Sequence, residues 1–382
     1  MSVLVTASDS PKALSVIRSL GRAGIPVTAS ADTKTSLGSS SKYCTGTFQY
    51  PSPRRFPEEY YRALSAFLKH HPHEVLIPVH SEDTQLIAKY KDNLSKLTKI
   101  PLHTYEAICE VNDKSRLMQV ARDLAIPCPK TYVVDDISEL GIISRQAEFP
   151  LVIKVRDSSG SRGVDYASSP EELKKKFPSV IKKYALSQPE YPILQEYIKG
   201  EGHGVSMLFN HGEPRAKFTH RRLREYPITG GPSTLRESIN HPAMEKIAAD
   251  LLGHYQWHGL AMVEFKIRDS DKKPILIEVN PRMWGSINLS ILAGVDFPHL
   301  LYTMAMEGDV KPVFSHATGV FSRNSLSDVV AMGSYLFHTG EIKNVGTAAI
   351  CPLNDDIISA DDPLPLFRFL KTGFEYMLNR NW

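Results

Sequence analysis

A short apolar hairpin decides the fold: residues 261–282 read AMVEFKIRDSDKKPILIEVNPR. Two apolar runs flank the polar stretch 269–273, a pattern that predicts two antiparallel strands joined by a turn. If the turn centres on Asp271, then Glu264 and Glu278 face each other, with their Cβ atoms about 5 Å apart. The hairpin therefore places two carboxylates side by side within apolar strands.

Carboxylates at this spacing repel each other and lose hydration. A divalent cation between them would relieve both costs, and strand alternation places Asn280 on the same face as Glu278. Such oxygen donors suit Mg²⁺ or Mn²⁺, with substrate phosphates completing the shell. Two alternatives are hydrated glutamates on a solvent-facing strand and neutralisation by Arg282 without a metal. The Trp-Gly-Ser turn at 284–286 favours a site, because it lets a ligand approach backbone amides.

Upstream of the hairpin, the N-terminal third alternates strands and helices. Residues 2–7 predict a strand, 10–23 an amphipathic helix and 26–31 a second strand, which together form a βαβ unit with a parallel sheet. No G-x-G-x-x-G follows the first strand, so the sheet resembles a Rossmann fold in architecture only. A nicotinamide-dependent oxidoreductase is therefore not supported.

Composition narrows the function classes further. The chain has 382 residues, enough for two or three domains at about 100–200 residues each. A net charge of +3 is too small to indicate binding to nucleic acid or to an anionic membrane. The 4 cysteines are widely spaced, and no targeting segment or run of about 18 apolar residues is present. These features predict a soluble cytoplasmic protein without disulfides.

The Glu…Glu-x-Asn-x-Arg arrangement of the hairpin resembles the ATP-grasp superfamily, which includes D-alanine–D-alanine ligase, biotin carboxylase and many carboxylate–amine ligases. Other motifs of the superfamily follow in the expected order. The resemblance implies an α/β chain in which a Rossmann-like pre-ATP-grasp domain precedes a two-lobed α+β ATP-grasp domain. The implied boundaries are 1–111 for the first domain, 112–310 for the second (small lobe 112–192, large lobe 193–310) and 311–382 for a C-terminal extension.

The same resemblance implies residue roles around ATP and Mg²⁺ or Mn²⁺. Glu264, Glu278 and Asn280 would hold the metal against the phosphates, and Arg282 would contact phosphate or the reacting group. Two lysines would bind phosphates, a Gly-Ser loop would cover them as a lid, and a hinge would bind adenine. The ribose acid is uncertain, because Gly202 stands where the superfamily often has it. The implied nucleotide residues are Lys114, Lys154, Ser159, Gly160, Gly163, Glu196, Tyr197, Ile198, Glu201 and His203.

An arginine-rich segment at 220–236 is the candidate clamp for a carboxylate or phosphate. Without the nucleotide motifs it would predict only an exposed basic strand and loop. We expect Arg221 or Arg222 near the γ-phosphate, with Lys154 and Arg282 as the other catalytic groups. Glu82 would receive a substrate amino group, although an acid at a helix N-terminus explains it equally. The expected substrate residues are Glu82, Arg224, Gly230, Gly231, Ser233, Arg236, Trp284, Gly285 and Ser286.

Together these motifs predict an ATP-dependent ligase that activates a carboxylate as an acyl phosphate and joins it to an amine. The partners are then small molecules, with no nucleic acid and no membrane, and related ligases are often homodimers. Two alternatives stay open. One is a bicarbonate-phosphorylating enzyme of the carboxylase or carbamoyl-phosphate-synthase type, and the other is a nucleotide-binding regulatory protein without catalysis.

Overall fold

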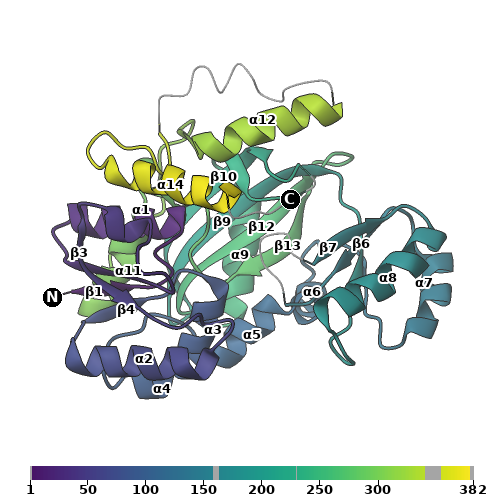
Figure 1. Cartoon of the computed structure of the whole chain (residues 1–382). Helices are drawn as coiled ribbons and strands as arrows, with labels where there is room; N and C mark the ends of the chain where they lie inside the picture. Colours follow the sequence, from purple (N-terminus) through teal and green to yellow (C-terminus); the bar gives the residue numbers. More distant parts are fainter. Residues whose placement is uncertain (1, 158–162, 229, 340–353, 379–382) are drawn as a thin grey trace.

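Three sheets organise the computed structural model (Figure 1). The structure describes residues 2–157, 163–228, 230–339 and 354–378. Ser159, Gly160 and most of the expected lid therefore lie outside the described residues, as does Cys351. Within the described ranges, no helix is both long and apolar enough to cross a membrane.

The N-terminal sheet is parallel, with strand order β3-β2-β1-β4. Its central strand is buried throughout, as expected for a parallel sheet covered by helices. Helix α1 begins after Ser10, whose hydroxyl accepts a hydrogen bond from the Ala13 amide. The elements are β1 (Val3–Val5), α1 (Pro11–Arg22), β2 (Val27–Ala31), β3 (Cys44–Gln49), α2 (Pro57–His70), β4 (Val75–Ile77), α3 (Ser81–Lys89), α4 (Lys91–Leu94), α5 (Tyr105–Asn112) and α6 (Lys114–Asp123).

A smaller antiparallel sheet, order β5-β8-β6-β7, stands apart on the other side of the molecule (Figure 1). Helices α7 and α8 pack on it around a separate core that runs from Val134 to Leu194. The elements are β5 (Thr131–Tyr132), α7 (Leu140–Gln146), β6 (Leu151–Lys154), β7 (Val164–Ala167), α8 (Pro170–Tyr184) and β8 (Ile193–Glu196). This sheet is the small lobe.

The large sheet has the order β13-β12-β9-β10-β11-β14 and carries the predicted hairpin at one edge. The sequence pattern did not predict the long strand β10. Its charged residues alternate with apolar ones too often for the pattern to indicate a buried strand. The elements are β9 (Gly200–Asn210), β10 (Glu213–Glu225), β11 (Ser233–Ser238), α9 (Pro242–His254), β12 (Gly259–Arg268), β13 (Pro274–Asn280), α10 (Ile287–Leu292), α11 (Phe297–Glu307), β14 (Phe321–Arg323), α12 (Ser325–Thr339) and α14 (Leu364–Leu378).

The N-terminal sheet and the large lobe share hydrophobic cores. Leu4 and Leu76 belong to the same buried cluster as Met207 and Val263, and α6 packs into that cluster through Leu117. Because α6 packs in the shared core, it is not part of the small-lobe core, whose first residue is Val134. At the other end, the small-lobe sheet extends to Glu196, past the expected limit of 192. The predicted fold class is confirmed: a parallel α/β unit precedes a two-lobed unit of antiparallel sheets.

Three buried ion pairs fasten the C-terminal extension to the rest of the chain. Arg18 on α1 pairs with Asp362 at 2.9 Å, and the other two pairs are Arg224–Asp328 and Arg236–Asp356. Buried charges are stable only when they are paired and hydrogen-bonded, so each pair fixes the local geometry. Residues 354–362 are thereby held between α1 and the large sheet.

Candidate active site

The site is built on one row of residues that crosses four strands of the large sheet. Glu278 on β13 pairs with Glu264 on β12, as the predicted turn at Asp271 requires. Glu264 in turn pairs with Gly204 on β9, and Gly204 pairs with His220 on β10. Sheet pairing alone therefore aligns two carboxylates, a glycine and a histidine.

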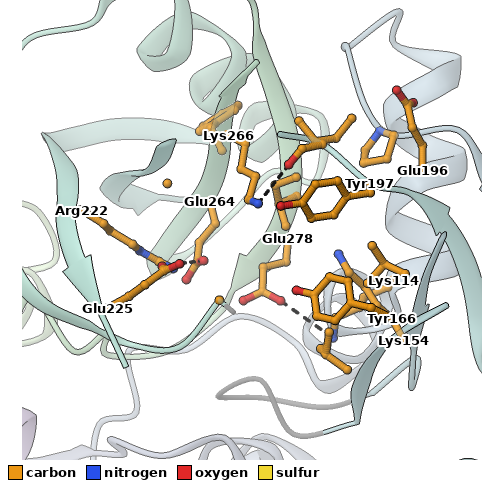
Figure 2. A pocket seen from close by; sticks show the side chains of 18 residues that line it. Lys114, Lys154, Tyr166, Glu196, Tyr197, Arg222, Glu225, Glu264, Lys266 and Glu278 are labelled. Carbon is orange, nitrogen blue, oxygen red and sulfur yellow. Dashed lines mark hydrogen bonds and ion pairs between the residues drawn. The ribbon is translucent and has the colours of Figure 1, made fainter. Parts of the chain in front are cut away.

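Glycine on the middle strand leaves room for long side chains to cross it. A Cβ at Gly204 would lie 2.5 Å from Cε1 of His220, and one at Gly202 would lie 3.1 Å from Cδ of Arg222. Arg222 uses this space to reach Glu264, with Nη2 and Oε2 2.5 Å apart (Figure 2). The Gly-x-Gly spacing on β9 is thus what allows β10 to contribute a charge to the hairpin.

The two carboxylates sit in different electrostatic surroundings. Burial raises the pKa of Glu264, assisted by the charge of Glu278 and opposed by Arg222. Burial would also raise the pKa of Glu278, but the charges of Lys114 and Lys154 outweigh it and lower the pKa. The lysines and the arginine therefore compensate a site that would otherwise hold two unscreened negative charges.

The two carboxylates supply the hard oxygen donors that a divalent cation prefers. Asn280 Nδ2 donates to Oε1 of Glu264 at 3.0 Å and to Oε1 of Glu278 at 3.2 Å, while its Oδ1 accepts from Arg282 at 2.6 Å, so its amide would have to turn over for the oxygen to join them as a ligand. No group of three or more His, Cys, Asp and Glu side chains is placed to hold a metal within the described ranges. A cation at this site would therefore need further oxygens, as nucleotide phosphates supply.

Two lysines from the small-lobe side face the carboxylates. Lys114 begins α6 and is almost fully buried, with its Nζ 3.9 Å from Oε2 of Glu278. Lys154 ends β6 in the small lobe, and burial lowers its pKa to about 8, opposed by the charge of Glu278. Both expected phosphate lysines thus lie beside the expected metal ligands, on the opposite wall of one cavity.

The residues of the expected adenine hinge, Glu196, Tyr197 and Ile198, line this same cavity. Two neighbours were missed in the sequence. Tyr166 meets Tyr197 edge-on with ring centroids 5.9 Å apart, and Lys266 Nζ donates to the Ile198 carbonyl oxygen at 3.0 Å (Figure 2). Lys266 could have been found from its spacing, because it follows Glu264 by two residues on the same strand face.

A second cavity of about 430 Å³ opens on the other side of the carboxylates. Glu264, Glu278 and Arg222 line both cavities, so the two spaces meet at the carboxylate pair. Arg282 lines the second cavity and donates to Ser81 Oγ at 2.7 Å. The expected substrate residues on its wall are Gly230, Gly231, Ser233, Arg236, Trp284, Gly285 and Ser286.

Several expected residues lie elsewhere. Arg224 lines neither cavity, because its guanidinium is buried in the ion pair with Asp328, and we correct its assignment to a structural role. Arg221 also lines neither and pairs with Glu237, so of the two arginines expected near the γ-phosphate only Arg222 lies at the site. Glu82 lies in the first turn of α3, outside both linings, where the helix dipole favours an acid.

The ribose and lid assignments gain less support. Gly202 lines the first cavity, the one that also contains Lys114 and Lys154, whereas the flanking Glu201 and His203 do not line it. Of the lid residues, only Gly163 is described, and its φ of 76° is one that glycine adopts readily. Arg236 reaches the second cavity, but Ser322, Ser233 and Asp356 already accept hydrogen bonds from its guanidinium.

The second cavity also contains residues that the sequence analysis did not single out. Lys12 at the start of α1, His220 on β10 and Asp356 in the C-terminal extension all line it. His220 is buried, its Nε2 lies 3.2 Å from Ser286 Oγ, and burial holds its pKa well below the usual range. These residues come from segments far apart in the sequence, so no local motif could have marked them.

The expected hinge, the paired carboxylates and the two buried lysines lie together between two antiparallel lobes, as the resemblance to the ATP-grasp superfamily implies. A family model described as "ATP-grasp in the biosynthetic pathway with Ter operon" matches residues 188–326. The predicted resemblance to the ATP-grasp superfamily is therefore confirmed by a model that covers this segment.

Solved structures with the same fold are distant in sequence. The biotin carboxylase domain of 2-oxoglutarate carboxylase from Hydrogenobacter thermophilus has a TM-score of 0.69 at 15% identity, covering 84% of this chain and 73% of that chain. An L-amino acid ligase from Bacillus licheniformis has a TM-score of 0.64 at 14% identity, covering 82% and 78%. N5-carboxyaminoimidazole synthetase from Staphylococcus aureus has a TM-score of 0.64 at 13% identity, covering 88% and 86%.

Proposed function

We propose that this chain is an ATP-dependent carboxylate–amine ligase that uses Mg²⁺. The observation that carries the proposal is the position of Glu264 and Glu278 at the junction of two cavities. One cavity carries the hinge and the two lysines, and the other carries Arg282 and the Gly-Gly turn. A phosphoryl group transferred at the junction would pass from a nucleotide in the first cavity to a carboxylate in the second.

The residues act by position and charge, and no side-chain nucleophile is needed. Lys114 and Lys154 bind the phosphates as compact charges. Arg222 and Arg282 flank the junction, where they neutralise charge that develops on the transferred phosphoryl group. Glu264, Glu278 and Asn280 would hold Mg²⁺, which when bound would neutralise further charge on the phosphate oxygens. The acid attacks the γ-phosphate, ADP leaves, and the amine then displaces phosphate from the acyl phosphate.

A second candidate is phosphorylation of bicarbonate. Its support is the similarity to the biotin carboxylase domain, whose structure was solved with MgADP and bicarbonate. At 15% identity this similarity establishes the fold and not the substrate. The second cavity, at about 430 Å³, is much roomier than bicarbonate requires, which favours a larger acid.

The deciding experiment measures ADP and phosphate release from Mg·ATP with amino acids singly and in pairs, other small acids and amines, and bicarbonate. We expect release that requires one acid together with one amine. Stimulation by bicarbonate alone would replace the ligase with the second candidate. Nucleotide binding without turnover on any member of the panel would support a regulatory protein. A homodimer is a further proposal, which the mass of the purified protein in solution tests.

A further inference from the structure

The C-terminal extension places an acid in the wall of the second cavity. Asp356 is only 3% exposed and lines the same cavity as Glu278, Asn280 and Arg282. Its Oδ2 accepts a hydrogen bond from Arg236, whereas its Oδ1 accepts none of good geometry within the part of the chain that the structure describes. The Asn288 amide, which donates to the Asp355 carbonyl oxygen at 3.1 Å, is near enough to lower the pKa of Asp356. A buried carboxylate oxygen without a donor is costly, so this oxygen is poised to accept one.

The segment that carries Asp356 is held firmly. The Asp356 amide donates to the Arg323 carbonyl oxygen at 2.9 Å, and Arg18 donates to the Asp356 carbonyl oxygen at 3.3 Å. The neighbouring Asp355 accepts hydrogen bonds from the amides of Ser325, Ile357 and Ile358. Hydrogen bonds therefore fix the backbone on both sides of Asp356, as a preorganised binding group requires.

A second buried pair in the same lobe shows what a purely structural pair looks like. Both oxygens of Asp328 are satisfied, because Oδ1 accepts from Arg224 Nε at 2.9 Å and from Thr234 Oγ1 at 2.8 Å, and Oδ2 accepts from Arg224. Asp328 also lines neither cavity. Asp356 differs on both counts, although both acids neutralise a buried arginine.

We propose that Asp356 binds a primary ammonium group of the substrate, an inference that rests on the proposed ligase function. An ionised carboxylate can only accept hydrogen bonds, so its ligand must be a donor, and an ammonium group adds a charge-assisted bond. Burial raises the pKa of Asp356, while Arg236 and the Asn288 amide oppose that effect and favour the ionised form. The ammonium group belongs either to the acid substrate, which is then an amino acid, or to the amine substrate as it binds, before its nitrogen loses a proton and attacks.

The test compares Asp356→Asn with Asp328→Asn, a matched loss of charge in a buried arginine pair whose acid does not line the cavity. Acid activation is measured alone as ADP release and hydroxamate formation with hydroxylamine, a small uncharged nucleophile. The complete reaction is then measured with the amine varied. Asp356→Asn should raise KM for the substrate that carries the ammonium group by about tenfold to a hundredfold and leave KM for ATP unchanged.

The hydroxylamine assay and the complete reaction together identify which substrate carries the ammonium group. A raised KM for the acid in the hydroxylamine assay assigns it to the acid, and a raised KM for the amine alone assigns it to the attacking amine. Unchanged KM for both substrates, or the same change in Asp328→Asn, would overturn the inference while leaving the ligase function intact. If no acid supports ADP release by the unmodified protein, the proposed function itself has failed.

A measurement on the unmodified protein covers the case in which Asp356→Asn does not fold. The preferred substrate is compared with its analogue in which a hydroxyl group replaces the ammonium group. We expect the hydroxyl analogue to have at least about tenfold higher KM. Equal KM values for the two compounds would contradict the role of Asp356.

Discussion

At the scale of single residues, Glu278 tests the metal site. Glu278→Gln keeps the shape of the side chain but removes the charge that faces Lys114 and Lys154. Turnover should fall at least about a hundredfold, because the cation that neutralises the phosphates would lose an anionic ligand. The measurement is Mg·ATP-dependent ADP release under saturating substrates. The fold should be unchanged, as judged by the circular dichroism spectrum.

The same hairpin supplies the control for that substitution. Asp271 lies at its turn, where it is exposed and pairs with Arg268 on the surface. Asp271→Asn removes an equal charge from the same two strands without touching either cavity. It should retain nearly full activity. Near-normal turnover in Glu278→Gln, or an equal loss in both variants, would rule out the metal role.

Lys154 predicts how nucleotide affinity depends on pH. Because burial lowers its pKa to about 8, the lysine is charged below that pH and becomes neutral above it. ADP binding, measured by calorimetry without metal, should therefore weaken by about tenfold for each pH unit above 8. Lys154→Arg keeps a charge throughout this range and should bind ADP with an almost constant affinity. A steep loss of affinity in both proteins would assign the titration to another group.

At the scale of strands, the Gly-x-Gly of β9 is a packing requirement. Gly204→Ala would place its Cβ 2.5 Å from Cε1 of the buried His220 ring, so the ring or the strand would have to shift. The free energy of unfolding should fall by about 1–3 kcal/mol, and activity should fall with it because β10 also carries Arg222. Urea denaturation followed by fluorescence measures the change in stability.

A glycine elsewhere shows whether that loss is specific. Gly253 lies in helix α9, and a Cβ there would meet nothing within 4 Å. Gly253→Ala should leave the protein as stable as before or more stable, by up to about 1 kcal/mol, because alanine favours helix. If both substitutions were neutral, the close approach of His220 to β9 would not constrain the strand.

Sequence reasoning succeeded where a pattern was local. The Glu264–Glu278 pairing followed from strand alternation and one turn, and the order of lysine, hinge and hairpin followed from a resemblance. Sequence reasoning failed for β10, where the arginines were expected to form one clamp. Arg221 is partly exposed, Arg224 is buried in an ion pair and Arg222 lies at the site. Arg221, Arg222 and Arg224 are near neighbours in the chain, yet only strand geometry and distant partners decide which one reaches the site.

At the scale of the molecule, the C-terminal extension joins parts that no local pattern connects. Asp356 and Asp362 lie far from Arg236 and Arg18 in the sequence, so no spacing rule predicts their pairing. The structure nonetheless shows that residues 354–362 contact both α1 and the large sheet. The extension therefore couples the N-terminal domain to the wall of the second cavity.

This coupling can be broken on one helix. Arg18→Ala would leave Asp362, whose side chain is 1% exposed, without its charged partner. The free energy of unfolding should fall by about 3–5 kcal/mol, the usual result of leaving a buried charge unpaired. Limited proteolysis should then cut the chain near 354–362, since Arg18 also holds the Ile357 and Asp362 carbonyl oxygens. Chemical denaturation gives the first quantity and mass spectrometry of the fragments gives the second.

Arg22, one helical turn further along α1, provides the control for Arg18. Its substitution removes the same charge from the helix without leaving a buried acid unpaired. It pairs with Asp361, but the two side chains are 45% and 41% exposed, so Arg22→Ala should cost less than about 1 kcal/mol. If Arg18→Ala also raises KM for the substrate that carries the ammonium group, then α1 acts on the cavity through the position of Asp356. If Arg18→Ala loses stability with unchanged KM, the extension is a structural brace only. Equal and small effects of both arginines would show that the extension is held by its apolar contacts, around Leu14 and Ile357, rather than by the buried pair.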